Sequence, residues 1–386
     1  MKIAVTGANG QIGSVILRCL AEFEGFEAVG VCRNRVGETV VASHGCEVRI
    51  GHISDPSSAR RLLDDCDTIV NCAFAVGLPR KSRRENERIV DSLAGLGEKH
   101  IVHFSSVAVY GQCIDSRRSS FEKPRTDTSY GHLKLALERR IARTQASSSG
   151  ACHVLRLGHV YGPNLWLSPQ IISLAQEPNF ALPFNGDKPS NTIHVERLAA
   201  AIVRLVAYPP PSGIYNLADH PQSSWRRLFD WHTRTLNLNE VHGMDPSRSE
   251  ALRAGFLRQA GGRGFMKGLV AAVRPAVAGG LQAILQGGSL RTLGDRVLAL
   301  LPSHVEDRVK GAYVTAAARR QIAELNERVG LKSLPWHFSD GMPGPYLEIP
   351  QDIPDIEGRP DWLEKQLRSW YFVGLEAPEN SMPFKR

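Results

Sequence analysis

A doubly wound α/β fold, with helices on both faces of a parallel sheet, is predicted by two features of the first 160 residues. Short apolar runs alternate there with longer amphipathic stretches, and a glycine-rich turn follows the first apolar run. The predicted strands are residues 3–6, 28–32, 47–50, 68–73, 101–105 and 152–157. The predicted helices between them are residues 12–22, 57–63, 83–95 and 130–144. Extended pieces at 192–195 and 213–217, with a helical pattern at 197–208 between them, are expected to follow later in the chain.

Three regions are expected along the chain. Residues 1–162 form the sheet domain, with sheet elements returning at about 190–218, and residues 163–245 supply elements of a smaller substrate-binding lobe. Residues 246–386 form a C-terminal extension that is mainly helical and becomes rich in proline after residue 331. No motif indicates what this extension does.

The cysteines and histidines argue against a disulfide framework and against a metal site. The seven cysteines all precede residue 153 and include no C-x-x-C pair, which is typical of buried thiols in a reducing compartment. No histidine spacing typical of a metal site is present either, so no metal is expected. Since no apolar run is long enough to span a bilayer, we expect a cytoplasmic protein.

The net charge of +8 is concentrated in one part of the C-terminal extension. Residues 253–291 contain six basic residues and no acidic one, and Arg263, Lys267 and Arg274 fall on one face of a helical projection. This pattern fits peripheral contact with the inner face of a membrane, and it fits equally a lid or oligomer helix with a solvated basic face. Nucleic-acid binding is not expected, because stacking aromatic residues do not alternate with the basic ones. We expect a homodimer that acts on a small molecule.

The glycine-rich turn predicts a dinucleotide site. A strand runs directly into Gly7-x-x-Gly10-x-x-Gly13, and a helix follows. Gly7 permits the tight turn, Gly10 allows the backbone to approach a pyrophosphate, and Gly13 allows close packing of the helix. The helix amino terminus then presents free N–H groups to the phosphates. The residues expected to bind the cofactor are Gly7, Asn9, Gly10, Gln11, Ile12 and Gly13 in the turn, with Asn71 and Ala73 near the end of the predicted fourth strand.

The end of the second strand favours NADP over NAD. NAD sites usually place a carboxylate there to bind the ribose 2′-hydroxyl, but this segment reads Val31-Cys-Arg-Asn-Arg35 and has no acid between Ala28 and Gly37. Arg33 or Arg35 can bind a 2′-phosphate through charge-assisted hydrogen bonds. The alternative is that both arginines are solvated loop residues and that the site also accepts NAD.

Tyr130 and Lys134 are the candidate proton-transfer residues. Moving a hydride to or from a carbinol carbon requires a group that moves a proton on the oxygen, and free tyrosine, with a pKa near ~10, is a weak base at neutral pH. A lysine four residues further along a helix lies on the same face, and its positive charge stabilises the phenolate. Tyr130 and Lys134 have this spacing.

Together these segments resemble the extended short-chain dehydrogenase/reductase family, the NAD-dependent epimerase/dehydratase group. The segments that carry the resemblance are the N-terminal glycine turn, Phe104–Gly111, Tyr130–Lys134 and Leu155–Pro163, and they cover about residues 1–240. The resemblance implies that Ser106, Tyr130, Lys134 and Asn86 are catalytic. It also implies that Tyr130 and Lys134 contact the cofactor, with Lys134 on the nicotinamide ribose. Ser106, Val107, Tyr130 and His159 are the residues expected at the substrate.

Some positions depart from the pattern of the family. Val107 and Ala108 stand where the 4,6-dehydratases have an Asp-Glu pair, and they cannot transfer protons, so dehydration by that mechanism is not expected. His159 replaces an asparagine that often contacts the diphosphate of sugar nucleotides. Ser190 replaces an arginine, and His52 replaces an acid expected near the adenine. These changes argue against a nucleotide-diphosphate substrate.

The first functional hypothesis is therefore an NAD(P)-dependent oxidoreductase that transfers hydride at a carbonyl or carbinol of a sugar-like or other polar small molecule. The second is a sugar-nucleotide epimerase that retains NAD and re-reduces the carbon it oxidises. A third, from another class, is a cofactor-sensing protein without catalysis, against which the intact Ser106, Tyr130 and Lys134 set argues.

Overall fold

The structure is a computed structural model, and the ranges that it describes stop at residue 251. They are residues 1–42, 44–76, 79–111, 124, 126, 128–145, 148–162, 165, 167–176, 180–219, 223–235 and 238–251. The prediction of a basic amphipathic segment at 253–291 and most of the expected C-terminal extension lie outside these residues. Within the ranges given, no helix is both long and apolar enough to cross a membrane.

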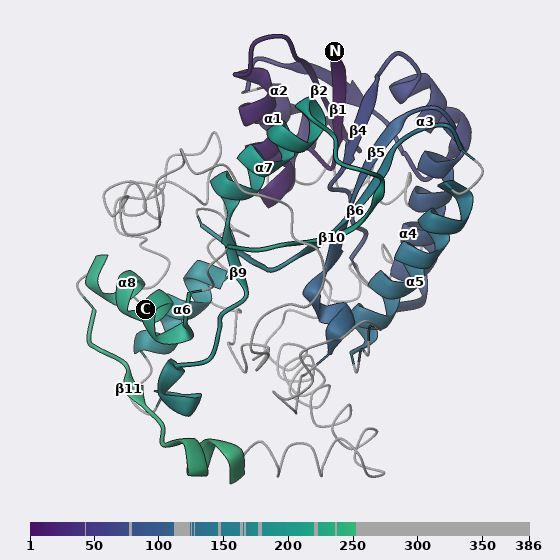
Figure 1. The fold of residues 1–386 in the computed structure, drawn as a ribbon. Helices are drawn as coiled ribbons and strands as arrows, with labels where there is room; N and C mark the ends of the chain where they lie inside the picture. The colour runs from purple at the N-terminus through teal and green to yellow at the C-terminus, as the bar shows by residue number, and fades with distance from the viewer. Residues whose placement is uncertain are drawn as a thin grey trace, which may run out of the picture.

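A seven-stranded parallel sheet forms the centre of the molecule and confirms the predicted fold class (Figure 1). Its strand order is β10-β6-β5-β4-β1-β2-β3. The strands are β1 (Lys2–Thr6), β2 (Glu27–Cys32), β3 (Glu47–Ile50), β4 (Thr68–Asn71), β5 (His100–Ser106), β6 (Cys152–Leu157) and β10 (Gly213–Leu217). The order reverses direction between β1 and β4, and in such sheets ligands bind at the carboxyl ends of the strands at that point.

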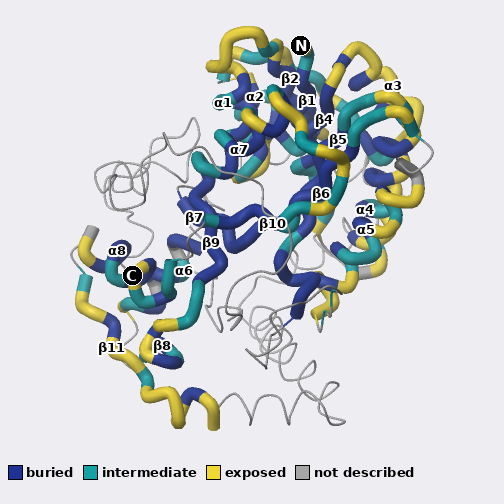
Figure 2. The backbone as a smooth tube through the Cα atoms, in the orientation of Figure 1, coloured by how far each residue is buried: buried dark blue, intermediate teal, exposed yellow. Residues whose placement is uncertain are grey.

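Helices cover both faces of the sheet, as predicted (Figure 1). One face packs against α1 (Gln11–Ala21), α2 (Arg35–Ala42) and α7 (Val195–Ala207). The other packs against α3 (Pro56–Leu63), α4 (Pro79–Ala94) and α5 (Ser129–Gln145). Figure 2 shows the central strands of the sheet as largely buried, because helices cover their apolar side chains on both faces.

A smaller lobe lies beyond the carboxyl ends of the strands and has an apolar core of its own. It contains α6 (Leu167–Gln176), β8 (Ala181–Leu182), η2 (Pro183–Gly186), α8 (Trp225–Thr235) and β11 (His242–Gly243). A two-stranded pair, β7 (His159–Tyr161) and β9 (Thr192–His194), leads from the sheet to this lobe. After β9, the chain returns to the large sheet through α7 and β10.

Most predicted elements are present with small shifts in their bounds, and three differences are notable. β4 ends at Asn71 and not at residue 73, because the chain leaves the sheet where Ala73 packs against the turn at Gly7. α4 begins at Pro79, which suits the first turn of a helix because its missing N–H has no partner to lose there. The short helix α2, which contains Gly37, was not predicted.

Candidate active site

Gly7 closes the turn between β1 and α1 in a conformation that other residues rarely adopt. Its φ is +66°, and a Cβ atom there would lie 2.8 Å from the Ala73 Cα atom. We expected Gly13 to allow close packing of the helix on the sheet. A Cβ atom on Gly13 would collide with the Gly7 carbonyl oxygen, so the close contact of the helix at this residue is with the turn itself. The two glycines therefore keep the backbone turn at residues 7–10, called the cradle below, free of obstructing side chains. The first turn of α1 lies directly behind this turn.

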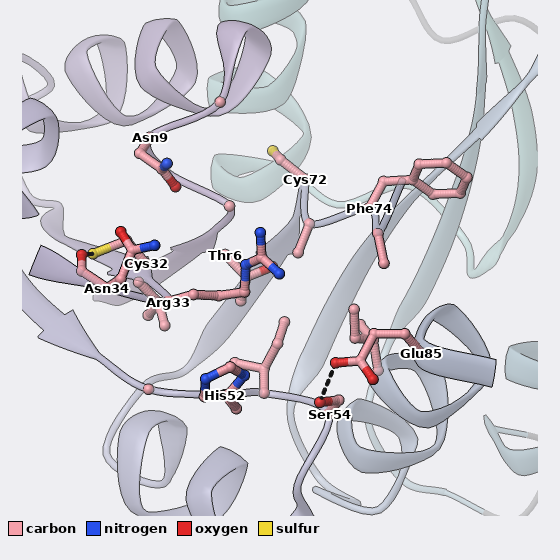
Figure 3. A pocket seen from close by; sticks show the side chains of 18 residues that line it. Thr6, Asn9, Cys32, Arg33, Asn34, His52, Ser54, Cys72, Phe74 and Glu85 are labelled. Atoms are coloured by element: carbon pink, nitrogen blue, oxygen red, sulfur yellow. Dashed lines mark hydrogen bonds between the residues drawn. The ribbon is translucent and has the colours of Figure 1, made fainter. Parts of the chain in front are cut away.

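A cavity of about 230 Å³ lies in front of this cradle (Figure 3). Its lining comes from the glycine turn and from the carboxyl ends of β2, β3 and β4, with two residues of α4. The lining residues include Gly7, Asn9, Gly10, Arg33, His52, Ser54, Ala73, Phe74 and Glu85. Gly7, Asn9, Gly10, Ala73 and Arg33 were predicted as cofactor residues, and all five border this cavity.

Arg33 and Arg35 have different positions. Arg33 extends from the end of β2 into the cavity, where its guanidinium lies between Asn9 and His52 in Figure 3. Arg35 begins α2 and is not among the lining residues. Glu85, on the opposite wall, is the one acidic side chain among the described lining residues, and its carboxylate accepts a hydrogen bond from the Ser54 hydroxyl at 2.6 Å.

Asn71 does not take the cofactor-contacting position that we expected. Its side chain is 2% exposed and lies between Thr6 and His103 on one face of the sheet. The Thr6 hydroxyl donates to Asn71 Oδ1 at 2.7 Å, and Asn71 Nδ2 lies 2.9 Å from His103 Nδ1. Because the amide is committed to both neighbours, Asn71 stabilises the junction of β1, β4 and β5 instead of lining the cavity.

Asn86, which was predicted to be catalytic, binds the backbone in this structure. Its Oδ1 accepts from the Ala75 backbone N–H at 2.9 Å, and its Nδ2 donates to the carbonyl oxygens of Ala75 and Ser82 at 2.9 and 2.8 Å. The side chain is buried in α4 and anchors the segment that follows β4. Asn86 therefore holds in place the backbone that forms one wall of the cavity.

Ser106, Tyr130 and Lys134 come together at the carboxyl end of the sheet. Ser106 ends β5, and the short helix η1 (Val107–Tyr110) follows it. Tyr130 and Lys134 lie on the first turns of α5. Gly131, between them in sequence, faces the Ala108 carbonyl oxygen so closely that a Cβ atom would collide with it. This absent side chain allows α5 to approach η1 and brings the Tyr130 hydroxyl within hydrogen-bonding reach of Ser106.

The Lys134 ammonium lies in a dry site. The residue is 6% exposed, and Nζ donates to the Phe104 carbonyl oxygen at 2.9 Å. Nζ also lies 4.2 Å from the centre of the Phe74 ring and 5.8 Å from that of Tyr130. Burial lowers the pKa of Lys134 to about 8, although the charge of Glu138 opposes this shift.

Tyr130 combines an accessible ring with a shielded hydroxyl. The residue is 45% exposed, and its ring contacts Phe74 edge-on with centroids 5.7 Å apart. Desolvation nonetheless raises the pKa of Tyr130, and the hydrogen bond with Ser106 opposes part of this shift. At neutral pH the phenol is therefore protonated and can donate a proton.

The two remaining predicted substrate residues, Val107 and His159, are both buried. Val107 is 5% exposed, and its side chain packs in η1 against Val109, Tyr110 and Ala218. His159 begins β7, is 8% exposed, and has its ring 5.8 Å from that of Trp225 in the smaller lobe. The Val107 side chain is therefore part of the packing, and His159 lies where the sheet meets the lobe.

A buried ionic network holds α5 against the sheet. Glu138, one turn after Lys134, accepts two hydrogen bonds from Arg156 at 2.9 and 2.7 Å and another from Ser105. Arg156 also donates to the Tyr110 hydroxyl at 3.0 Å, and Tyr110 donates to Asn216 at 2.7 Å. The network thus joins α5 to β5, β6, η1 and β10.

Sequence reasoning did not identify Phe74, Glu85, Glu138 or Gly131 as residues of the site. Glu138 was detectable in principle, since it continues the i, i+4 spacing of Tyr130 and Lys134 on one helix face. Phe74 and Glu85 follow no local pattern, because only the packing of α4 and α5 on β4 brings them here.

The residues present fit a dinucleotide. The backbone cradle has no side chain that obstructs it, the first-turn N–H groups of Gln11, Ile12 and Gly13 lie at the amino terminus of α1, and a basic side chain extends into the cavity. Among the described residues, no group of three or more metal-ligating side chains is present.

Two curated proteins are similar to part of the sequence. The probable low-salt glycan biosynthesis reductase Agl14 of Haloferax volcanii is 27% identical over 169 residues, which cover 41% of this chain and 53% of that relative. The match thus spans about half the length of this curated relative. An uncharacterized protein of Schizosaccharomyces pombe is 36% identical over 74 residues, 19% of this chain and 25% of that protein.

Solved structures of sugar-nucleotide epimerases share the fold. UDP-glucuronic acid 4-epimerase from Bacillus cereus, in complex with UDP-glucuronic acid and NAD, has a TM-score of 0.52 and 18% identity over 65% of this chain and 92% of that chain. UDP-N-acetylglucosamine 4-epimerase from Methanobrevibacter ruminantium, in complex with UDP-N-acetylmuramic acid, has a TM-score of 0.53 and 20% identity over 63% and 85%. These likenesses concern the fold. The sequence model of the NAD dependent epimerase/dehydratase family matches residues 3–218, more than half of the chain, and the protein therefore belongs to this family of NAD-dependent enzymes.

Proposed function

We propose that this protein is an NADP(H)-dependent reductase or dehydrogenase that acts on a carbonyl or carbinol carbon of a sugar-like or other polar small molecule. The observation that carries the proposal is the meeting of Ser106, Tyr130 and Lys134 beside a dinucleotide cavity. The reductase relative of Haloferax volcanii is consistent with this reaction class.

The cofactor would be held by the residues around the cradle. The N–H groups of Gln11, Ile12 and Gly13 would bind the pyrophosphate, Arg33 the 2′-phosphate, and Lys134 the nicotinamide ribose. When bound, the nicotinamide supplies or accepts the hydride. Among the described lining residues at the end of β2 none is acidic, which supports NADP over NAD. The relative named above from Bacillus cereus binds NAD, so NAD is the competing cofactor.

The side chains of this chain supply the proton transfer. In the reductive direction, the Tyr130 hydroxyl donates its proton to the carbonyl oxygen while the Ser106 hydroxyl binds the same oxygen. A raised Tyr130 pKa suits this direction, because the phenol enters the reaction protonated. The positive charge of Lys134 then stabilises the phenolate that remains. Val107 and Ala108 follow Ser106 and carry no acid or base, which argues against elimination.

The test is NADPH consumption with a panel of keto sugars and keto-sugar nucleotides. Tyr130→Phe should lower turnover on the order of 10²–10⁴-fold, since it removes the proton donor. Tyr208→Phe is a matched control, because Tyr208 is 77% exposed at the end of α7 and should leave turnover unchanged. Equal turnover of wild type and Tyr130→Phe would refute the catalytic assignment.

A sugar-nucleotide epimerase is the second candidate, and the epimerases among the structural neighbours favour it. An epimerase re-reduces the carbon that it oxidises, so it retains its cofactor and shows no net consumption. Purified protein that carries bound NAD and interconverts two UDP-sugars without added NADPH would select this candidate over the reductase.

A further inference from the structure

Phe74 joins the dinucleotide cavity to the proton-transfer residues. It lies in the segment after β4, lines the cavity, and is partly buried (Figure 3). The face of its ring lies under the Lys134 ammonium, with 4.2 Å between Nζ and the ring centre. The same ring meets Tyr130 at an interplanar angle of 78°, with centroids 5.7 Å apart. One aromatic ring therefore contacts both members of the pair.

The backbone around Phe74 is anchored. Asn86 binds both the N–H and the carbonyl oxygen of Ala75, and the Ser82 hydroxyl donates to the same carbonyl oxygen at 2.6 Å. These bonds fix the residue that follows Phe74, and the side chains that form them are buried. The ring is thus presented to Lys134 by a rigid support.

The Lys134 ammonium has few other groups that compensate its charge. The titratable groups around it among the described residues are Tyr130 and Glu138 on α5, Cys72 after β4, and His103 on β5. The Glu138 carboxylate is bound to Arg156, burial raises the pKa of the Cys72 thiol, and burial lowers the pKa of His103 to about 3. Tyr130, Cys72 and His103 are therefore neutral at pH 7, and the one carboxylate is already paired.

We propose that Phe74 is a positioning residue of the Tyr130/Lys134 pair. The face of its ring keeps Lys134 in the ammonium form within a dry site, and its edge fixes the orientation of the Tyr130 ring. The role of Phe74 in catalysis rests on the proposed function. The physical contact that it describes does not depend on any substrate.

The direct test is a titration of Lys134 by NMR in protein with isotope-labelled lysine, with the signal assigned by its loss in Lys134→Met. Phe74→Leu removes the aromatic face but keeps an apolar side chain, so the Lys134 pKa should fall by about one unit. Phe74→Trp keeps an aromatic face and should leave the pKa at or above that of wild type. Phe180→Leu is the control, because Phe180 stacks on Phe229 in the smaller lobe and should not change it.

The second readout is the pH dependence of kcat/KM. In Phe74→Leu, the alkaline limb should move to lower pH by the same amount, because a neutral Lys134 no longer stabilises the phenolate. An unchanged Lys134 pKa in folded Phe74→Leu would overturn the inference. If that variant does not fold, Phe74→Met, which has no ring but a flexible side chain of similar length, takes its place. The NMR titration requires neither cofactor nor turnover, so a protein inactive with NADPH would refute the proposed function and leave this result intact.

Discussion

The glycine turn and the Tyr130/Lys134 pair belong to the same site but are constructed in different ways. The turn is made by consecutive residues, and its constraints are local: Gly7 has a positive φ, and Gly13 packs on the carbonyl of Gly7. The pair depends on segments far apart in sequence, with Phe74 after β4 on one side and Glu138 bound to Arg156 of β6 on the other. The geometry of the glycine turn is therefore set by its own residues. The chemistry of the Tyr130/Lys134 pair depends in addition on neighbours from other parts of the sequence.

The largest loss of stability is expected at the buried Glu138–Arg156 ion pair, which holds α5 and its Tyr130/Lys134 pair against the sheet. Glu138→Ala leaves the Arg156 charge buried without its partner and should lower the free energy of unfolding by about 3–5 kcal/mol. Urea unfolding followed by circular dichroism measures this loss. The control is Glu87→Ala on α4, which breaks an ion pair with the exposed side chain of Arg83 and should cost less than about 0.5 kcal/mol. Similar losses in the two variants would show that α5 does not depend on the buried network.

A smaller effect is expected in the turn. Gly7→Ala forces an alanine into a positive φ and against the Ala73 backbone, and should cost about 1–3 kcal/mol together with most of the affinity for the dinucleotide. Gly45→Ala separates the two causes, because Gly45 has a similar φ of +69° but no heavy atom within 4 Å of the added Cβ. Isothermal titration with NADPH should show weakened binding for Gly7→Ala alone. If both variants bind equally well, the close contact with Ala73 does not matter for the cradle.

The preference for NADPH over NADH should change when Arg33, which lines the cavity, is replaced, and not when Arg35, which does not line it, is replaced. Arg33→Ala should weaken NADPH binding by about 10–100-fold and change NADH binding much less, because the lost hydrogen bonds are charge-assisted. Arg35→Ala, two residues further on and outside the lining, should leave the NADPH/NADH ratio of dissociation constants unchanged. A ratio that moves only in Arg35→Ala would reverse the assignment.

Buried histidines should make the stability of the protein depend on pH. Burial lowers the pKa of His103, near the pair, to about 3 and that of His100, at the amino end of β5, to about 4. Because the unfolded chain takes up protons near pH ~6.5, stability should be full above that value and should fall as the pH drops from about 6.5 toward 4. Thermal melting across this range measures the slope, and His100→Gln should reduce it. A slope confined to pH values below 4 would assign it to carboxylates instead.

Most of the sheet was predictable from the sequence because most of its strands are short apolar runs, and the central ones are buried on both faces. The bounds of β3, β6 and β10 agree with the predicted strands to the residue. α2 was missed because it has only eight residues and one of them is Gly37, although its apolar residues recur with helical spacing. β4 was predicted too long because Cys72 and Ala73 are apolar like the strand, and only the contact with Gly7 shows where the chain departs.

The roles of site residues were predictable where they follow from the spacing of residues along the chain. They were not predictable where they depend on contacts with residues from other elements. Lys134 follows Tyr130 by one helical turn, so their meeting could be inferred from the chain. Asn86 and Asn71 are amides that can serve a ligand or the backbone equally well, and only their neighbours show that both serve the structure. Phe74 lies among alanines at a strand end, and its contact with Lys134 depends on how α5 packs.

The outer strand β3 has a consequence for self-association. It is four residues long and lies at one margin of the sheet, where an unpaired backbone edge can recruit a strand from another molecule. Arg49 within it pairs with Glu47 and with Asp65, and Lys2 adds a further bond to Glu47 at 3.2 Å. A short strand with charged side chains is a poor template for edge-to-edge aggregation. We therefore expect copies of this protein to associate through surfaces other than the β3 edge, and to resist aggregation there as long as these charges are kept.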